Sequence, residues 1–188
     1  MAVIAGAVLA AGSGTRMGTP KAELRIDGTR LLDRAVAALT GAGCAPVVAV
    51  IRHGTQVAGA TPVVNPDPER GMRSSLALAV DAVGDAGALA IVLVDAPGIG
   101  PGAIRAVVDA WRPGRIATAR YAGRRGHPVV MAPALWRQAL ALAGPDEGAR
   151  PLLKARPELV DEVDVPGDPT DLDTPDDVRH WLDRPAHP

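Results

Sequence analysis

Short apolar runs alternate along this chain with segments in which apolar residues recur at helical spacing. Runs of Val, Ile, Leu and Ala with few polar residues are typical of strands that are buried on both faces of a parallel sheet. Apolar residues three and four positions apart predict amphipathic helices. Strands that alternate with helices predict an α/β fold, a three-layer Rossmann-like open sheet that is mostly parallel and carries helices on both faces.

The predicted elements are short and are separated by clusters of Gly, Pro, Asn and Asp. Strands are expected over residues 3–9, 47–51, 61–64, 89–94, 116–121 and 129–131, with an edge strand over 160–165. Helices are expected over residues 31–39, 74–83, 101–111, 135–142, 147–155 and 175–182, and a basic turn over 123–126. No internal repeat and no Ser/Gly-rich linker divides the chain, so we expect one domain over residues 1–188.

Composition and charge exclude several classes of protein. The 188 residues are 47% hydrophobic with no Phe, so aliphatic side chains must fill the core. A net charge of −1 and few aromatic residues argue against nucleic acid as a partner. The single cysteine, Cys44, excludes an intramolecular disulfide and a Cys-rich zinc site, and it is expected to be a small buried side chain.

The beginning of the chain is apolar, but no positive residue precedes the run, and a buried strand predicts the same composition as a signal peptide. No stretch approaches the ~20 apolar residues that a membrane span needs. We therefore expect a soluble, cytoplasmic protein without membrane contact.

The strongest chemical signal is a glycine-rich loop directly after the first predicted strand. Residues 9–21 read Leu-Ala-Ala-Gly-Ser-Gly-Thr-Arg-Met-Gly-Thr-Pro-Lys. Glycines at this place let backbone N–H groups surround an anion, while Arg16 and Lys21 neutralise phosphate oxygens. The spacing fits neither the dinucleotide fingerprint Gly-x-Gly-x-x-Gly nor the P-loop, which requires Gly-Lys-Ser/Thr. The alternative is a structural turn with two solvated cations.

Two carboxylates are candidate ligands for Mg²⁺, a cation that prefers oxygen and shares phosphates with the protein. Asp95 follows a buried strand, at the sheet edge where open α/β folds bind ligands; its alternative role is to cap the turn before Pro97. In residues 171–177, Thr174 and Asp177 fit a capping box. Asp173 has no capping role there, and we expect it to be the second ligand.

Most of these segments resemble the nucleotidyltransferases that activate sugars, isoprenoid precursors and molybdopterin. The loop matches their pattern Leu-Ala-x-Gly-x-x-x-Arg-Met-Gly followed by Lys, residues 95–97 resemble their Asp-x-Pro element, and residues 65–75 and 171–177 resemble two further segments. The resemblance implies a nucleotide-diphospho-sugar transferase-like fold, Mg²⁺ as cofactor and catalytic roles for Arg16, Lys21 and Asp95. The nucleotide-binding residues that it implies are Leu9, Ala10, Ala11, Gly12, Ser13, Gly14, Thr15, Arg16, Lys21, Gly71, Ser74 and Ser75. A plain helix N-cap explains one of the two serines equally well.

Shorter segments that resemble one branch of this group indicate the nucleotide and the acceptor. With Ala11, the loop resembles that of molybdenum cofactor cytidylyltransferases, whereas guanylyltransferases usually have a second Gly there. Residues 126–128 and 146–153 resemble two elements of the same family, which implies that His127 and Arg150 contact the acceptor. Residues 22–24, and the lack of a Gly before Asp146, depart from the pattern. His127 can equally be structural, and Arg124 with Arg125 can be a solvated turn.

The implied reaction transfers CMP from CTP to molybdopterin and releases pyrophosphate. The attacking phosphate is already anionic, so alignment and charge stabilisation matter more than a general base. Arg16 would hold the β,γ-phosphates, Lys21 the α-phosphate, and Asp95 with Asp173 the Mg²⁺. The resemblance also implies transient contact with a molybdoenzyme or its chaperone. The alternatives are a guanylyltransferase, a sugar-phosphate nucleotidyltransferase, or a fold relative that acts as an oxidoreductase or non-catalytic nucleotide-binding protein.

Overall fold

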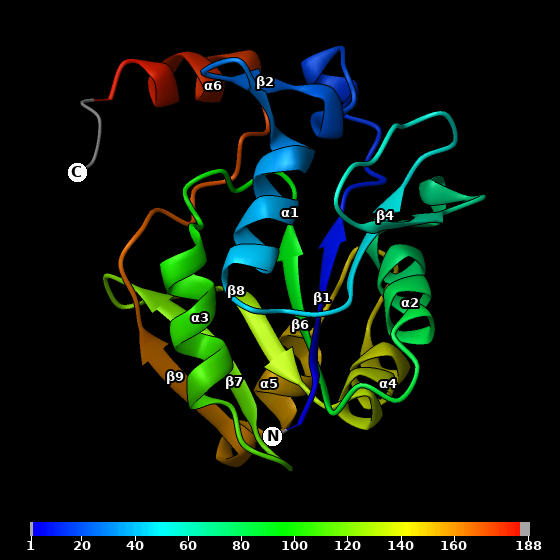
Figure 1. The fold of residues 1–188 in the computed structure, drawn as a ribbon, viewed down its shortest axis with the longest axis vertical. Helices are drawn as coiled ribbons and strands as arrows, with labels where there is room; N and C mark the ends of the chain where they lie inside the picture. The colour runs from blue at the N-terminus through cyan, green and yellow to red at the C-terminus, as the bar shows by residue number, and fades with distance from the viewer. Residues whose placement is uncertain (1, 185–188) are drawn as a thin grey trace.

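The computed structural model describes residues 2–184 and, within them, every side chain except that of Arg16. A seven-stranded sheet has the order β5-β4-β1-β6-β8-β7-β9, and all its pairings are parallel except the two made by β8 (Figure 1). The strands of this sheet are β1 (Ile4–Leu9), β4 (Val47–Ile51), β5 (Thr61–Val64), β6 (Ala88–Leu93), β7 (Ile116–Tyr121), β8 (Arg124–Met131) and β9 (Val160–Asp164).

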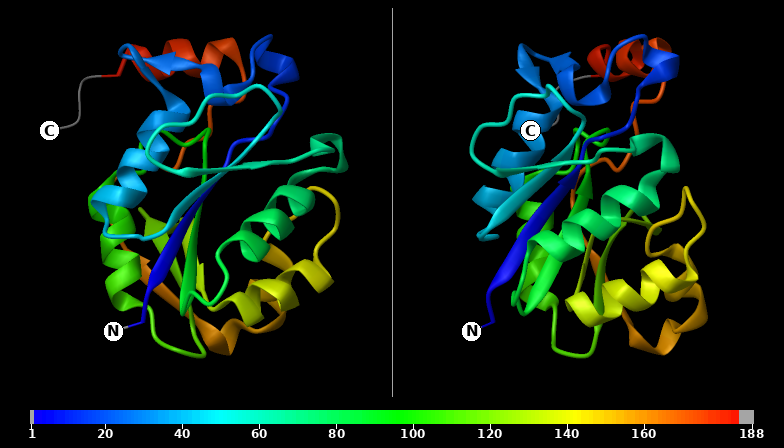
Figure 2. Two further views of the ribbon diagram at one scale, coloured as in Figure 1. Left: turned by 45° about the vertical axis from the view of Figure 1, so that its right-hand side comes forward. Right: turned by 90° about the vertical axis from the view of Figure 1, so that its right-hand side faces the viewer.

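Helices cover both faces of this sheet, which confirms the predicted fold class. Two helices pack on one face, three pack on the other, and the last lies beyond the carboxyl ends of the parallel strands (Figures 1 and 2). In that order they are α1 (Leu31–Gly41), α3 (Pro101–Ala110), α2 (Met72–Ala82), α4 (Pro133–Leu142), α5 (Arg150–Ala155) and α6 (Pro175–Leu182). None of the described helices is long and apolar enough to cross a membrane.

The core is aliphatic and is divided by the sheet into two layers. Along β1 the side chains alternate, so that Val8 packs with α1 and α3 while Ala7 and Leu9 pack with α2, α4 and α5. Cys44 is buried in the first layer, as expected. In the second layer the indole N–H of Trp136 donates to the carbonyl of Leu89 at 3.0 Å, which satisfies a polar group inside an apolar region.

Most predicted elements are confirmed, but two boundaries in the C-terminal half were wrong. The β7–β8 turn is only Ala122-Gly123, with φ of 47° and 83°, so Arg124 and Arg125 belong to β8 and not to a basic turn. Two residues with positive φ match the twist of a tight hairpin. The helix expected to begin at Glu147 begins at Arg150, because residues 145–146 form a turn and residues 147–149 are irregular.

A small hairpin was missed altogether. Strands β2 (Arg25–Ile26) and β3 (Thr29–Arg30) pair around Asp27-Gly28, whose φ values are 51° and 77°. Asp-Gly is a strong hairpin signal, but the strands are too short to show alternation in the sequence. Beside α6, the hairpin lies above the carboxyl ends of β1 and β6 (Figure 2).

The order in which strands are added to the sheet reverses between the parallel strands β1 and β6. The chain continues from β1 to β4 on one side, and from β6 to β7 and β8 on the other. In open α/β sheets a ligand crevice forms at such a switch point, outside the carboxyl ends of the strands. The glycine-rich loop leaves β1 here and Asp95 follows β6, so the fold brings the two main sequence signals to one edge.

Candidate active site

The glycine-rich loop closes on itself through Gly14. With φ of 61°, this residue adopts a left-handed conformation, and an added Cβ would lie 2.2 Å from the carbonyl oxygen of Thr19. A Cβ added at Gly12 would meet no protein atom within 4 Å. Gly14 is therefore required by the loop itself, whereas Gly12 lies beside open space into which a ligand can approach.

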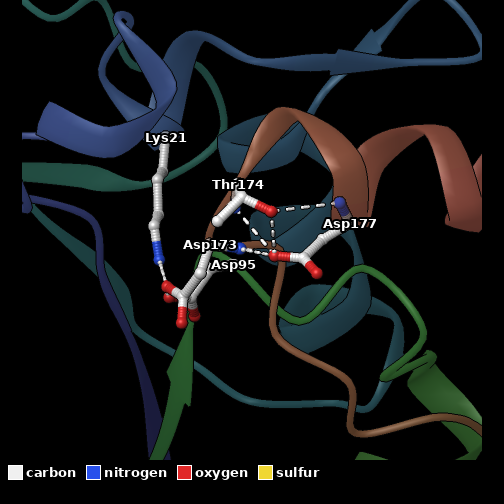
Figure 3. Close-up of polar contacts among 5 residues, drawn as sticks. All are labelled: Lys21, Asp95, Asp173, Thr174 and Asp177. Carbon is white, nitrogen blue, oxygen red and sulfur yellow. Dashed lines mark hydrogen bonds and ion pairs between the residues drawn. The ribbon is translucent and has the colours of Figure 1, made fainter.

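Lys21 reaches from the end of this loop to two carboxylates. It begins a 3-10 helix, η2 (Lys21–Glu23), which is anchored by the fully buried Ala22. Its Nζ donates to Asp95 Oδ2 at 2.6 Å and to Asp173 Oδ1 at 2.5 Å (Figure 3). The structure thus joins three predicted site residues that are up to 152 positions apart.

This ion cluster keeps Lys21 charged. Burial alone would lower the pKa of Lys21, but hydrogen bonds to Asp173 and Asp95, and the charges of both carboxylates, raise it above its ordinary value. The lysine side chain is 16% exposed and that of Asp95 18%, so solvent screens their attraction less than at an open surface.

The two carboxylates are placed by one backbone contact and one helix cap. The N–H of Leu172, a fully buried residue, donates to the carbonyl of Asp95 at 2.8 Å and ties the C-terminal segment to the end of β6. The predicted capping box is confirmed, since the Asp177 carboxylate accepts from the Thr174 N–H at 2.8 Å (Figure 3). Thr174 and Asp177 together cap α6, which leaves the Asp173 carboxylate to contact Lys21.

The residues at this cluster fit a divalent cation. Asp95 Oδ1 is buried and has no hydrogen-bond partner among the described residues, which is unusual for a charged oxygen. In that same part of the chain, no group of three or more His, Cys, Asp or Glu side chains is placed to hold a metal. A pair of carboxylates is what Mg²⁺ commonly takes from a protein when phosphates and water supply its other ligands.

Asp171 is a site residue that the sequence analysis missed. Leu172 points into the core, Asp173 contacts Lys21, and Asp171 lines the adjoining cavity. Desolvation, with smaller contributions from Asp95 and Asp173, raises the pKa of Asp171 to about 6. The sequence did contain a signal for Asp171, because Asp171 and Asp173 flank the apolar Leu172. In an extended segment, a buried residue between two polar ones turns both polar side chains toward the same side.

The first turn of α2 is held by a buried amide. Gly71 is the N-cap, so neither serine has the alternative role of helix N-cap. Asn65 Nδ2 donates to Ser74 Oγ at 2.9 Å and to Ser75 Oγ at 3.0 Å. Gly71 has φ of 87°, and an added Cβ would lie 2.5 Å from Asp146 Oδ1. The predicted nucleotide segment therefore touches the predicted acceptor segment directly.

Arg52 is a second residue that was missed. It follows β4, and its guanidinium donates to the carbonyl of Ala11 at 3.3 Å and to Glu69 at 2.9 Å. This contact ties the glycine-rich loop to the loop before α2. Its signal was a cation directly after a buried strand of the same sheet.

A cavity of about 540 Å³ opens beside the ion cluster, between the β7–β8 hairpin and the loop before α5. His127 lies on its wall, with Nδ1 3.1 Å from the carbonyl of Ile91, so Nδ1 carries the proton. Burial lowers the pKa of His127, which favours the neutral ring. The other polar residues of the wall include Arg124, Arg125, Arg150, Asp146 and Asp171.

The arginines of this wall differ in their partners. Arg125 donates to Glu162 at 2.9 Å through Nε and is tied to the neighbouring strand β9. Arg124 and Arg150 are exposed and form no ion pair or side-chain hydrogen bond within residues 2–184. Two cations thus remain available to an anion in the cavity, and the structure places both predicted acceptor residues, His127 and Arg150, along it.

Comparison with known proteins agrees with this geometry. The sequence matches the family model of the MobA-like NTP transferase domain over residues 6–162. It is 33% identical over 196 aligned positions to nicotine blue oxidoreductase from Paenarthrobacter nicotinovorans, with 95% of this chain and 96% of the relative covered. It is 36% identical over 124 positions to a probable molybdenum cofactor guanylyltransferase from Opitutus terrae, with 63% and 61% covered.

Solved structures give the same result. The crystal structure of Rv0371c from Mycobacterium tuberculosis H37Rv superposes with a TM-score of 0.81 at 28% identity, covering 98% of this chain and 100% of that chain. A second structure of Rv0371c, in complex with manganese, gives a TM-score of 0.77 at 28% identity over 96% and 98%. With its family match over most of its length, the chain belongs to the MobA-like NTP transferase family and is a nucleotidyltransferase by that membership.

Proposed function

We propose that this protein transfers CMP from CTP to molybdopterin in the presence of Mg²⁺ and releases pyrophosphate. The observation that carries the proposal is the cluster of Lys21, Asp95 and Asp173 beside the glycine-rich loop, at the switch point of the sheet. A nucleoside triphosphate needs backbone donors, cations and metal-holding carboxylates at one place, and this edge supplies all three.

In this proposal the residues align two anions rather than transfer protons. The loop N–H groups and Lys21 balance negative charge as the acceptor phosphate attacks the α-phosphate and pyrophosphate leaves. Asp95 and Asp173 would hold Mg²⁺, which when bound supplies further positive charge to the phosphate oxygens. The predicted grip of Arg16 on the β,γ-phosphates stays a prediction, because its side chain lies outside the described residues.

The choice of molybdopterin as acceptor and of cytosine as nucleobase rests on the cavity lining and on the sequence of the glycine-rich loop. Arg124, Arg150 and the neutral His127 line a cavity next to the ion cluster and suit a molecule that carries both a phosphate and a hydrogen-bonding ring. Ala11, in the Leu-Ala-Ala-Gly form of the loop, favours CTP, whereas the Opitutus relative is named a guanylyltransferase. GTP is therefore the first alternative for the nucleotide, and a sugar phosphate for the acceptor.

One observation favours a second candidate function. The Paenarthrobacter relative, which aligns over nearly the whole chain, is named an oxidoreductase. An oxidoreductase built on this fold has no need for a lysine between two carboxylates, and this chain has that arrangement. The presence of the cluster is why we place nucleotidyl transfer first.

The test is pyrophosphate release with Mg²⁺, molybdenum-loaded molybdopterin and each of CTP, GTP, ATP and UTP in turn. Release with CTP alone, abolished in Asp95→Asn, supports the proposal. Release with GTP alone keeps the mechanism and overturns the base. No release with any nucleotide, together with consumption of reduced nicotinamide cofactor when nicotine blue is added, would establish the oxidoreductase instead.

A further inference from the structure

The two carboxylates expected to hold a metal are bridged here by a lysine of the same chain. Lys21 Nζ lies 2.6 Å from Asp95 Oδ2 and 2.5 Å from Asp173 Oδ1, and these are charge-assisted hydrogen bonds (Figure 3). A divalent cation held by the same pair would take these oxygens for itself, since Mg²⁺ and ammonium both bind to carboxylate oxygen. Lysine and metal therefore compete for one pair of ligands.

We propose that Lys21 is an internal counter-ion that occupies the metal ligands when no nucleotide is bound, and moves to the nucleotide phosphates when the metal–nucleotide complex enters. The inference rests on the proposed function for the identity of the anion that takes Lys21. It gives the lysine two alternative positions and makes metal binding depend on the presence of nucleotide.

The charges of the cluster support this exchange. One ammonium between two carboxylates leaves a net charge of −1, and without Lys21 the pair would carry −2 in a partly buried place. A divalent cation added while Lys21 stays would face a positive group at contact distance, which costs free energy where solvent screens little. The metal consequently binds tightly only if the ammonium leaves.

The glycine-rich loop offers Lys21 a second position near a bound anion. The backbone of Lys21 lies against Gly14, since a Cβ added to Gly14 would be 3.2 Å from the backbone nitrogen of Lys21. An anion held by the glycine-rich loop is thus within reach of a lysine side chain that rotates about its own flexible stem. Burial of Ala22 keeps the backbone in place while the side chain changes partner.

The ammonium of Lys21 satisfies only one of the two carboxylate oxygens of Asp95. Its Oδ2 accepts from Lys21, but Oδ1 is buried and unpaired among the described residues. Leaving a buried charged oxygen without a partner is costly, and a state that satisfies both oxygens is favoured. The contact with Lys21 therefore holds the site together without satisfying Asp95 fully.

The consequence is a measurable coupling between two ligands. By linkage, if nucleotide draws Lys21 away and so raises metal affinity, then metal raises nucleotide affinity by the same factor. Direct bonds between the metal and the phosphates also couple the two ligands, so the share that is due to Lys21 is measured by metal binding without nucleotide. Removing the charge of Lys21 should therefore strengthen metal binding, although it weakens turnover.

We would titrate the protein with Mn²⁺ without nucleotide or acceptor, and follow free Mn²⁺ by electron paramagnetic resonance. Lys21→Met keeps an unbranched side chain one atom shorter and removes the charge, and this variant is expected to bind Mn²⁺ at least about 10-fold more tightly than wild type. Lys21→Arg keeps the charge and should bind as weakly as wild type. Asp95→Asn in the Lys21→Met background should abolish the gain, which places the ion at this pair.

A second readout covers the case in which Lys21→Met folds poorly. Without metal its midpoint of thermal unfolding should fall, because two carboxylates lose their counter-ion, and saturating Mn²⁺ should raise that midpoint more than it does in wild type. Equal or weaker Mn²⁺ affinity in Lys21→Met, or a gain that survives Asp95→Asn, would overturn the proposal. Failure of wild type to release pyrophosphate would instead overturn the proposed function and leave the Mn²⁺ result standing.

Discussion

The two sides of the candidate site are built differently. On the nucleotide side, charged groups are paired at short distance: Lys21 bridges two carboxylates, and Arg52 joins the loop to Glu69. On the acceptor side, Arg124 and Arg150 are exposed and have no ion-pair partner in the described part of the chain. On the nucleotide side the protein's own charges pair with one another, whereas on the acceptor side two cations have no ion-pair partner among the described residues.

This difference separates two tasks. Paired charges keep Lys21 and the two carboxylates together until a metal–nucleotide complex takes over their partners, so this side suits a reaction step that needs close alignment. Exposed arginines on a hairpin and a loop bind an anion without fixing which molecule carries it. We therefore expect substitutions on the nucleotide side to change turnover, and those on the acceptor side to change affinity for one substrate.

The largest effect is expected on the nucleotide side. Asp95→Asn should lower kcat roughly 10³-fold, because it removes one of two metal-holding charges at the reacting phosphate. The fold should be kept, since Lys21 retains Asp173 as a partner. Pyrophosphate release measures the loss and circular dichroism checks the fold; a kcat within 10-fold of wild type would erase the proposed division between the two sides.

A matched glycine pair sharpens the same side. Gly12→Ala adds a Cβ that meets no protein atom, so stability should stay within about 0.5 kcal/mol while the Kd for nucleotide rises between about 10- and 100-fold. Gly14→Ala puts the Cβ 2.2 Å from a backbone oxygen and should lower the free energy of unfolding by about 1–3 kcal/mol. Urea unfolding and a fluorescent nucleotide separate the two effects. Unchanged nucleotide binding in Gly12→Ala would show that the anion does not approach there.

On the acceptor side the effect should be confined to one substrate. Arg150→Ala and Arg124→Ala are each expected to raise KM for the acceptor about 10-fold, with KM for nucleotide unchanged. Arg125→Ala is the control, because its guanidinium is already engaged by Glu162. Steady-state kinetics with each substrate varied in turn decides this. Equal effects of all three substitutions would mean that only the overall charge matters.

The smallest effect tests the residue that connects the two sides. The pKa of Asp171 is raised to about 6 by desolvation first and then by Asp95 and Asp173, so its ionised form destabilises the fold. That penalty begins near pH 4, where the acid ionises in the unfolded chain, grows as the pH rises, and is nearly complete at about pH 6. Asp171→Asn should therefore raise the free energy of unfolding at pH 8 by about 1 kcal/mol at most, since solvent screens this exposed group, and by much less at pH 4.

Chemical denaturation at the two pH values measures this difference, with the exposed Asp183→Asn as control. A gain that is equal at pH 4 and pH 8 would mean that charge is not the cause. No gain at pH 8 would mean that Asp171 is already compensated by Lys21 and Arg124, whose charges act in the opposite direction on its pKa.

Local patterns predicted most of the fold. The ranges of β4, β5, β7 and α6 were predicted to the residue, because apolar runs and a Thr-Pro cap act through neighbours in sequence. The β2–β3 hairpin was not, because its two-residue strands are too short to form a pattern. The start of β8 was not, because Arg124-Arg125-Gly126 is polar and contains a glycine, which is typical of a turn. The start of α2, expected near Ser74, lies at Met72, directly after the N-cap Gly71.

The sequence by itself identified most of the candidate residues for the chemistry: a glycine-rich loop with its lysine, and acids placed after strands or before a helix. These are local properties of backbone conformation and side-chain type. Only the tertiary structure decided which of these residues contact one another. It bridged Asp95 and Asp173 with Lys21, turned Asp171 toward the cavity, tied Arg125 to β9 and gave Arg124 no ion-pair partner among the residues that the structure describes. Such contacts between distant segments depend on strand order and packing, which no local pattern encodes.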